Sequence, residues 1–118
     1  MSAAQGNLAT ATAQQLAAAL EAYEAEVEHI ISPHPDPETY QRVRHRLDEM
    51  RRYSAALPSL SVAWVELLIT HFELTQDLWR SQQGQLEWDE VLKAREQHAH
   101  SLARLCEHCR KLLLRSGA

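Results

Sequence analysis

Residues 59–81, SLSVAWVELLITHFELTQDLWRS, decide the fold class because their apolar side chains recur at helical spacing. One stripe along this segment, with alternate spacings of four and three residues, holds Leu60, Trp64, Leu67, His71, Leu74 and Leu78. Such a stripe is typical of a helix that packs in a bundle. Pro58 precedes the segment and Gly84 follows it, and both residue types end helices.

The same spacing predicts three more helices, over residues 8–31, 37–56 and 87–115. The first two are separated by Ser32–Pro37, which holds three prolines, and Asp36 is predicted to cap the second helix. Short links favour antiparallel neighbours, so we expect an all-α fold, an antiparallel up-down four-helix bundle that self-associates. The alternative is a helical hairpin dimer with a long fourth helix. We expect residues 1–7 to be a flexible N-terminus and residues 8–118 to be one domain.

The length and composition exclude several other classes of chain. The chain has 118 residues, 45% of them hydrophobic and 24% charged, with 3 Gly and 4 Pro. These values exclude a disordered chain, a collagen-like chain and a loop-rich disulfide scaffold. No apolar run approaches the ~20 residues of a membrane span, so no membrane partner is expected. Two cysteines without a secretory signal favour a reducing compartment, and we predict a cytoplasmic location.

The charges are divided unevenly along the chain. Residues 1–41 hold six acidic residues and no Lys or Arg, whereas residues 42–118 hold all 12 basic residues. This division predicts ion pairs between the first segment and the rest of the chain. One basic cluster stands out, at Arg42, Arg44, His45, Arg46, Arg51 and Arg52. We interpret it as a solvated face opposite the acidic segment, so nucleic acid is an unlikely partner at a net charge of −4.

The segment 59–81 carries a second apolar stripe besides its core stripe. Its members, again spaced by three and four, are Val62, Val65, Ile69, Phe72, Gln76 and Trp79. A helix that is apolar nearly all round is either central or covered by a partner, and a square of four helices has no central position. We therefore predict a protein-binding surface anchored by Phe72 and Trp79, formed with a second copy or another protein. The alternative is an irregular bundle in which another part of the chain covers the stripe.

Two pairs of residues are candidates for a metal site. His71 and His98 fall at the same level if the third and fourth helices form a hairpin, and two facing imidazoles are potential ligands. Cys106 and Cys109 form a C-x-x-C, which is half of a tetrahedral thiolate site. Neither pair is complete, and buried core residues are the commoner interpretation of both. No metal or other cofactor is therefore predicted.

The sequence favours a non-enzymatic protein. It contains no glycine-rich phosphate loop, no G-x-S-x-G and no H-E-x-x-H, and no small-molecule substrate is indicated. We predict a small helical protein–protein interaction module, a homodimer or an adaptor, that uses Val62, Val65, Ile69, Phe72 and Trp79. The alternative is a transition-metal-binding bundle that uses His71 with His98 or Cys106 with Cys109.

Overall fold

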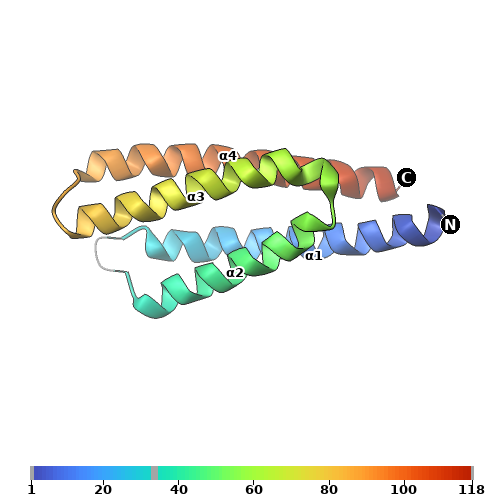
Figure 1. Ribbon diagram of the computed structural model, residues 1–118, viewed down its shortest axis with the longest axis horizontal. Coiled ribbons are helices and arrows are strands. Elements are labelled where there is room, and N and C mark those ends of the chain that lie inside the picture. Colours follow the sequence, from blue (N-terminus) through green and yellow to red (C-terminus); the bar gives the residue numbers. More distant parts are fainter. Residues whose placement is uncertain (1, 33–34, 118) are drawn as a thin grey trace.

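The computed structural model describes the backbone of residues 2–32 and 35–117 and the side chains of residues 8–32 and 35–115. Its four helices are α1 (Ser2–Ile30), α2 (Pro37–Ala55), α3 (Ser61–Gln82) and α4 (Trp88–Gly117), with a short 3-10 turn, η1 (Pro58–Leu60), before α3. Successive helices run in opposite directions along a body of 56 × 24 × 18 Å (Figure 1). The predicted all-α, up-down four-helix bundle is confirmed.

Two helix ends are set by the residues found there, the start of α2 and the end of α3. The Asp36 side chain accepts a hydrogen bond from the Glu38 amide at 3.1 Å and caps α2, with Pro37 at the first helical position. Gly84 has a positive φ of 73° just beyond α3, a conformation that favours glycine. Pro33 and His34, in the predicted break after α1, lie outside the described residues.

The start of α1 differs from the prediction. The helix begins at Ser2, six residues before the expected start, because the alanine-rich opening continues the helix without a proline. The side chains of residues 1–7, the segment expected to be a flexible N-terminus, lie outside the described residues. α1 and α4 both extend past the α2–α3 connection, at the end where α1 begins and α4 ends (Figure 1).

The predicted stripes meet in one core. The side chains that are least exposed come from all four helices and include Leu16, Leu20, Tyr23, Val43, Met50, Leu67, Leu74, Val91 and Leu105. Arg95 of α4 has the helical spacing of the core residues Val91 and His98, but its guanidinium turns outward and donates to Glu28 Oε2 at 2.7 Å. A charged group gains more from this pairing at the surface than it would from burial among leucines.

The packing between helices is uneven. α1 packs along α2 and α4, and α3 packs along α4, whereas α2 and α3 approach each other at few points. Near the start of α2, only long side chains reach across, as where Gln82 Nε2 donates to the Tyr40 hydroxyl at 3.4 Å. One side of the bundle is therefore open between α2 and α3.

Candidate protein-interaction face

The second stripe of α3 lies at the surface of the chain. Its large apolar side chains are roughly half or more exposed, with values of 69% for Val62, 49% for Val65, 53% for Ile69, 59% for Phe72 and 55% for Trp79. We call these five residues, together with Gln76 between them, the α3 face. Since no described part of the chain covers the α3 face, the alternative of an irregular bundle that buries the stripe is wrong.

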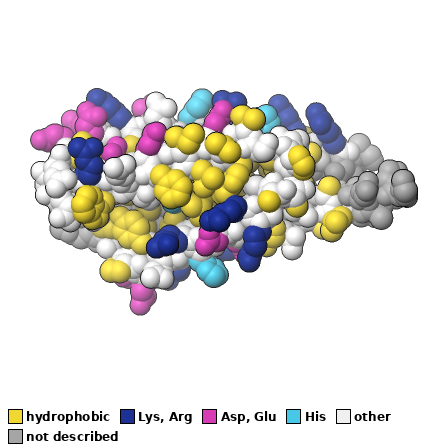
Figure 2. All heavy atoms as spheres, viewed as in Figure 1, with side chains coloured by type: hydrophobic (Ala, Val, Ile, Leu, Met, Phe, Trp, Pro, Cys, Tyr) yellow, Lys and Arg dark blue, Asp and Glu magenta, His cyan; other side chains and the backbone are white. Residues whose placement is uncertain are grey.

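The α3 face follows heptad spacing. Its members alternate between positions a (Val62, Ile69 and Gln76) and d (Val65, Phe72 and Trp79). α3 therefore carries two seams, one facing the core of its own bundle and one left unpaired. Apolar side chains gather on this side of the molecule, along α3 and toward α2 (Figure 2).

A groove between α2 and α3 adjoins the α3 face. It has a volume of 360 Å³, and Phe72 and Thr75 of α3 line one side while Val43 and Leu47 of α2 line the other. The groove exists because α2 and α3 are splayed apart. A helix lying on the α3 face would thus meet a hollow beside Phe72 that has both apolar and charged walls.

Charged residues flank these apolar surfaces. On α2, Arg44 lines the groove and makes no ion pair with any residue whose side chain the structure describes, whereas Arg51 is paired with Asp48. On the side toward α4, Glu66 is paired with Arg104 at 3.2 Å. Exposed pairs of this kind contribute little stability, but they affect which partner is accepted.

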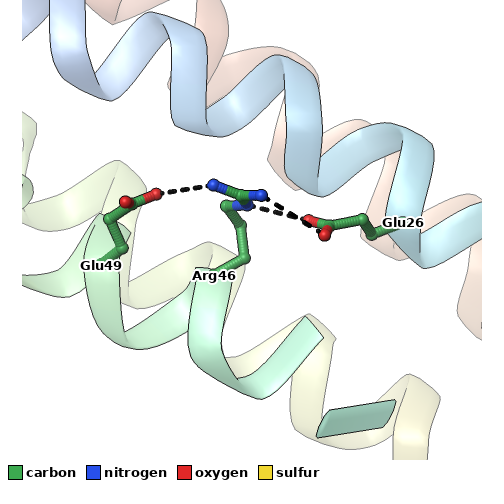
Figure 3. A network of polar contacts seen from close by, with 3 residues as sticks. All are labelled: Glu26, Arg46 and Glu49. Atoms are coloured by element: carbon green, nitrogen blue, oxygen red, sulfur yellow. Dashed lines mark hydrogen bonds and ion pairs between the residues drawn. The ribbon is translucent and has the colours of Figure 1, made fainter. Parts of the chain in front are cut away.

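The basic cluster is partly neutralised by the acidic first segment. Arg46 bridges two helices, with its Nε 2.9 Å from Glu26 Oε1 of α1 and its Nη1 2.9 Å from Glu49 Oε1 (Figure 3). Arg95 makes the equivalent link from α4 to Glu28 of α1. The predicted pairing between the first segment and the rest of the chain is therefore confirmed at these two arginines.

The two candidate histidines meet in the core, as predicted, and Tyr23 of α1 lies between them. The Tyr23 hydroxyl is 2.8 Å from His71 Nδ1 and 2.7 Å from His98 Nε2, and all three side chains are buried. A hydroxyl has one proton to donate, so it donates to one imidazole and accepts from the other. Tyr23 thus gives a hydrogen-bond partner to His71 Nδ1 and to His98 Nε2.

Burial keeps both imidazoles neutral at pH 7, because it lowers the pKa of each. Burial lowers the pKa of His71 to about 4, helped by repulsion from His98. Burial likewise lowers the pKa of His98 to about 4, although the nearby Glu28 carboxylate opposes the shift. Burial raises the pKa of the Tyr23 hydroxyl, which stays protonated.

The cysteine pair lies further along α4, where it faces α1. Cys109 is buried and its thiol donates to the Ala13 carbonyl of α1 at 3.3 Å, while Cys106 is partly buried, and both are free thiols. Burial raises the pKa of the Cys106 thiol to about 11 and also raises that of Cys109. Within the described residues, no three or more His, Cys, Asp or Glu side chains come together as a metal site.

Comparison with known proteins does not assign the chain to a family. No protein-family model matches the chain, and neither a curated protein nor a solved structure matches it. Among the described residues, no helix is both long and apolar enough to cross a membrane.

Sequence reasoning found the α3 face and both histidines but missed the role of Tyr23. Tyr23 lies between Leu20 and Val27 at the spacing of core residues, so its position alone did not distinguish it from them. The available clue was chemical, because a buried tyrosine hydroxyl needs a hydrogen-bond partner, and the core stripes offer few polar groups besides His71 and His98.

Proposed function

We propose that this chain is a non-enzymatic protein–protein interaction module that acts by burying the α3 face against a protein partner, as a homodimer or as an adaptor. The observation that carries the proposal is the row of five large apolar side chains, each at least 49% exposed and interrupted only by Gln76. Large contiguous apolar patches on otherwise folded proteins mark interaction sites. The two aromatic residues serve as anchors, since aromatic side chains contribute much of the energy of interfaces.

The area of the α3 face suits this role. Five half-exposed side chains of this size present on the order of 500 Å² of apolar surface, at the upper end of the largest patch on an ordinary monomer. Polar groups are available around it, from Arg44 on the α2 side to Glu66 and Arg104 on the α4 side. The arrangement of an apolar centre and a charged rim resembles that of protein interfaces in general. We also propose a cytoplasmic location, since two cysteines that form no disulfide favour a reducing compartment.

The double variant F72Q/W79Q tests the proposal. We expect it to keep the wild-type unfolding free energy within about 1 kcal/mol, because both side chains are more than half exposed. We expect capture of partner proteins by the tagged chain in cells, including an untagged copy of itself, to fall at least about tenfold, the loss of one moderate anchor.

The matched control is L92Q/L114Q, which replaces exposed leucines of α4 away from the α3 face. It should capture partners as the wild type does. Equal capture by F72Q/W79Q and the wild type, or unfolding of F72Q/W79Q, would show that the α3 face is not the interaction surface.

A further inference from the structure

We infer that the α3 face is covered by a second copy of this chain, whose α3 runs antiparallel to the first and places its Phe72 against Ile69. This inference rests on the proposed function, and it specifies the partner, the direction and the register. In this register, the numbers of the two residues that meet across the interface always add to 141. Val62 then meets the partner's Trp79, Val65 meets the partner's Gln76, and the contacts repeat about a two-fold axis.

The order of side-chain sizes along α3 supports this register. The first half of the α3 face carries only the β-branched residues Val62, Val65 and Ile69, and the second half carries both aromatic residues, Phe72 and Trp79, with Gln76 between them. Antiparallel pairing places each aromatic residue opposite a β-branched one, and it places Val65 opposite Gln76, a side chain of similar volume. Parallel pairing would place Phe72 against Phe72 and Val62 against Val62, leaving crowded and empty layers in turn. A foreign partner would not require this ordering.

The residues that border the α3 face also permit the pairing. On the side toward α2 the bordering positions of α3 itself are uncharged, and Leu68 would lie beside the partner's Thr75. On the other side, Glu66 would lie beside the partner's Glu73. Arg104, which already holds Glu66 at 3.2 Å, supplies a cation between these two acids. One border of α3 is therefore uncharged, with Arg44 of α2 beyond it, and the repulsion on the other border is offset.

The area is that of a weak dimer. Two copies of the α3 face contribute together on the order of 1,000 Å² of apolar surface, about the minimum for a biological interface and in the range of weak, transient ones. Contacts of the groove residues beside Phe72 add to this area. The expected complex is therefore a reversible homodimer that dissociates on dilution.

Cysteine cross-linking tests the register. Val65 and Gln76 share a layer across the two copies, so a mixture of V65C and Q76C chains should form a disulfide-linked dimer joined through these two residues. Each variant alone should not cross-link at its new cysteine. In a homodimer, equal positions would lie 11 residues apart along the helix axis, about 16 Å, which is too far for a disulfide. The wild type, with Cys106 and Cys109 only, is the control, and peptide mapping identifies the linked residues.

The variant E73K tests the same register by charge. Made in an R104Q background, which removes the cation between the two acids, and compared with R104Q alone, it would place a lysine beside the partner's Glu66 on both sides of the two-fold axis and replace repulsion by attraction. We expect the dimer dissociation constant to fall about threefold or more, with the effect declining as salt is added. An unchanged or weaker dimer would contradict the antiparallel register.

The outcomes separate this inference from the proposed function. Cross-linking of V65C alone, no cross-link in the mixture, or a wild type that stays monomeric at millimolar concentration would overturn the inference. The proposed function would survive those results where F72Q/W79Q still abolishes capture of another protein. Undiminished capture by F72Q/W79Q would overturn both.

Discussion

Acidification from pH 7 to pH 4 is expected to lower the unfolding free energy by several kcal/mol. His71 and His98 have a pKa of about 4 in the folded chain, below the 6.5 of an unburied histidine. Below pH 6.5 the unfolded chain binds protons that the folded core excludes, so stability is complete above pH 6.5 and is lost as the pH falls toward 4. With one proton per histidine, the slope approaches about 2.7 kcal/mol per pH unit.

Denaturant unfolding at pH 7, 6 and 5 measures this slope. H98Q removes one titrating group and keeps a side chain that can bond the Tyr23 hydroxyl, so the slope should fall by about half. H100Q is the matched control, because His100 is exposed on the same helix, and it should keep the wild-type slope. An unfolding free energy that is level between pH 7 and pH 5 would contradict the buried network.

The variant Y23F is expected to destabilise the chain by about 2 to 4 kcal/mol, because it leaves two buried imidazole nitrogens without a partner. The hydroxyl joins His71 of α3 to His98 of α4 from its position on α1. Removing it leaves the packing of the ring unchanged. The loss of unfolding free energy therefore comes from the missing hydrogen bonds and not from a cavity. Thermal and denaturant unfolding at pH 7 measure it.

The matched control for Y23F is Y40F. The Tyr40 hydroxyl accepts one 3.4 Å hydrogen bond from the exposed Gln82 side chain, and its removal should change the unfolding free energy by no more than about 0.5 kcal/mol. Equal effects of the two variants would mean that the Tyr23 hydroxyl does not bridge the histidines.

Periodicity explains why the helices were predictable. The core stripe from Leu60 to Leu78 and the α3 face differ in their direction around one helix, and helical geometry converts sequence spacing directly into direction. The same reasoning placed His71 and His98 at one level, because the short connection between α3 and α4 limits their relative shift. These features depend on residues that are near in sequence or joined by a tight turn.

Contacts between distant segments were not predictable in the same way. Tyr23 is 48 residues from His71 and 75 residues from His98, and nothing in the local pattern sets how far α1 slides along α3 and α4. The groove between α2 and α3 was missed for a similar reason. Spacing shows which side chains face inward but not how widely two neighbouring helices separate.

Local competition leaves the start of α3 without a side-chain cap. Ser59 and Ser61 each have the side chain to cap α3, yet α3 has no side-chain cap. The 3-10 turn Pro58–Leu60 leads directly into the helix, and the Ser61 hydroxyl donates instead to the Pro58 carbonyl at 2.9 Å. A turn that already continues the helical path removes the position at which a cap forms.

The most direct test of the central claim, that the α3 face pairs with a second copy, is the solution mass measured by sedimentation equilibrium over a range of concentrations. We expect the wild type to approach twice 13.5 kDa and to dissociate on dilution. F72Q/W79Q should remain at 13.5 kDa throughout, with its fold intact. Equal masses for the two proteins at every concentration, or an unfolded double variant, would contradict the account.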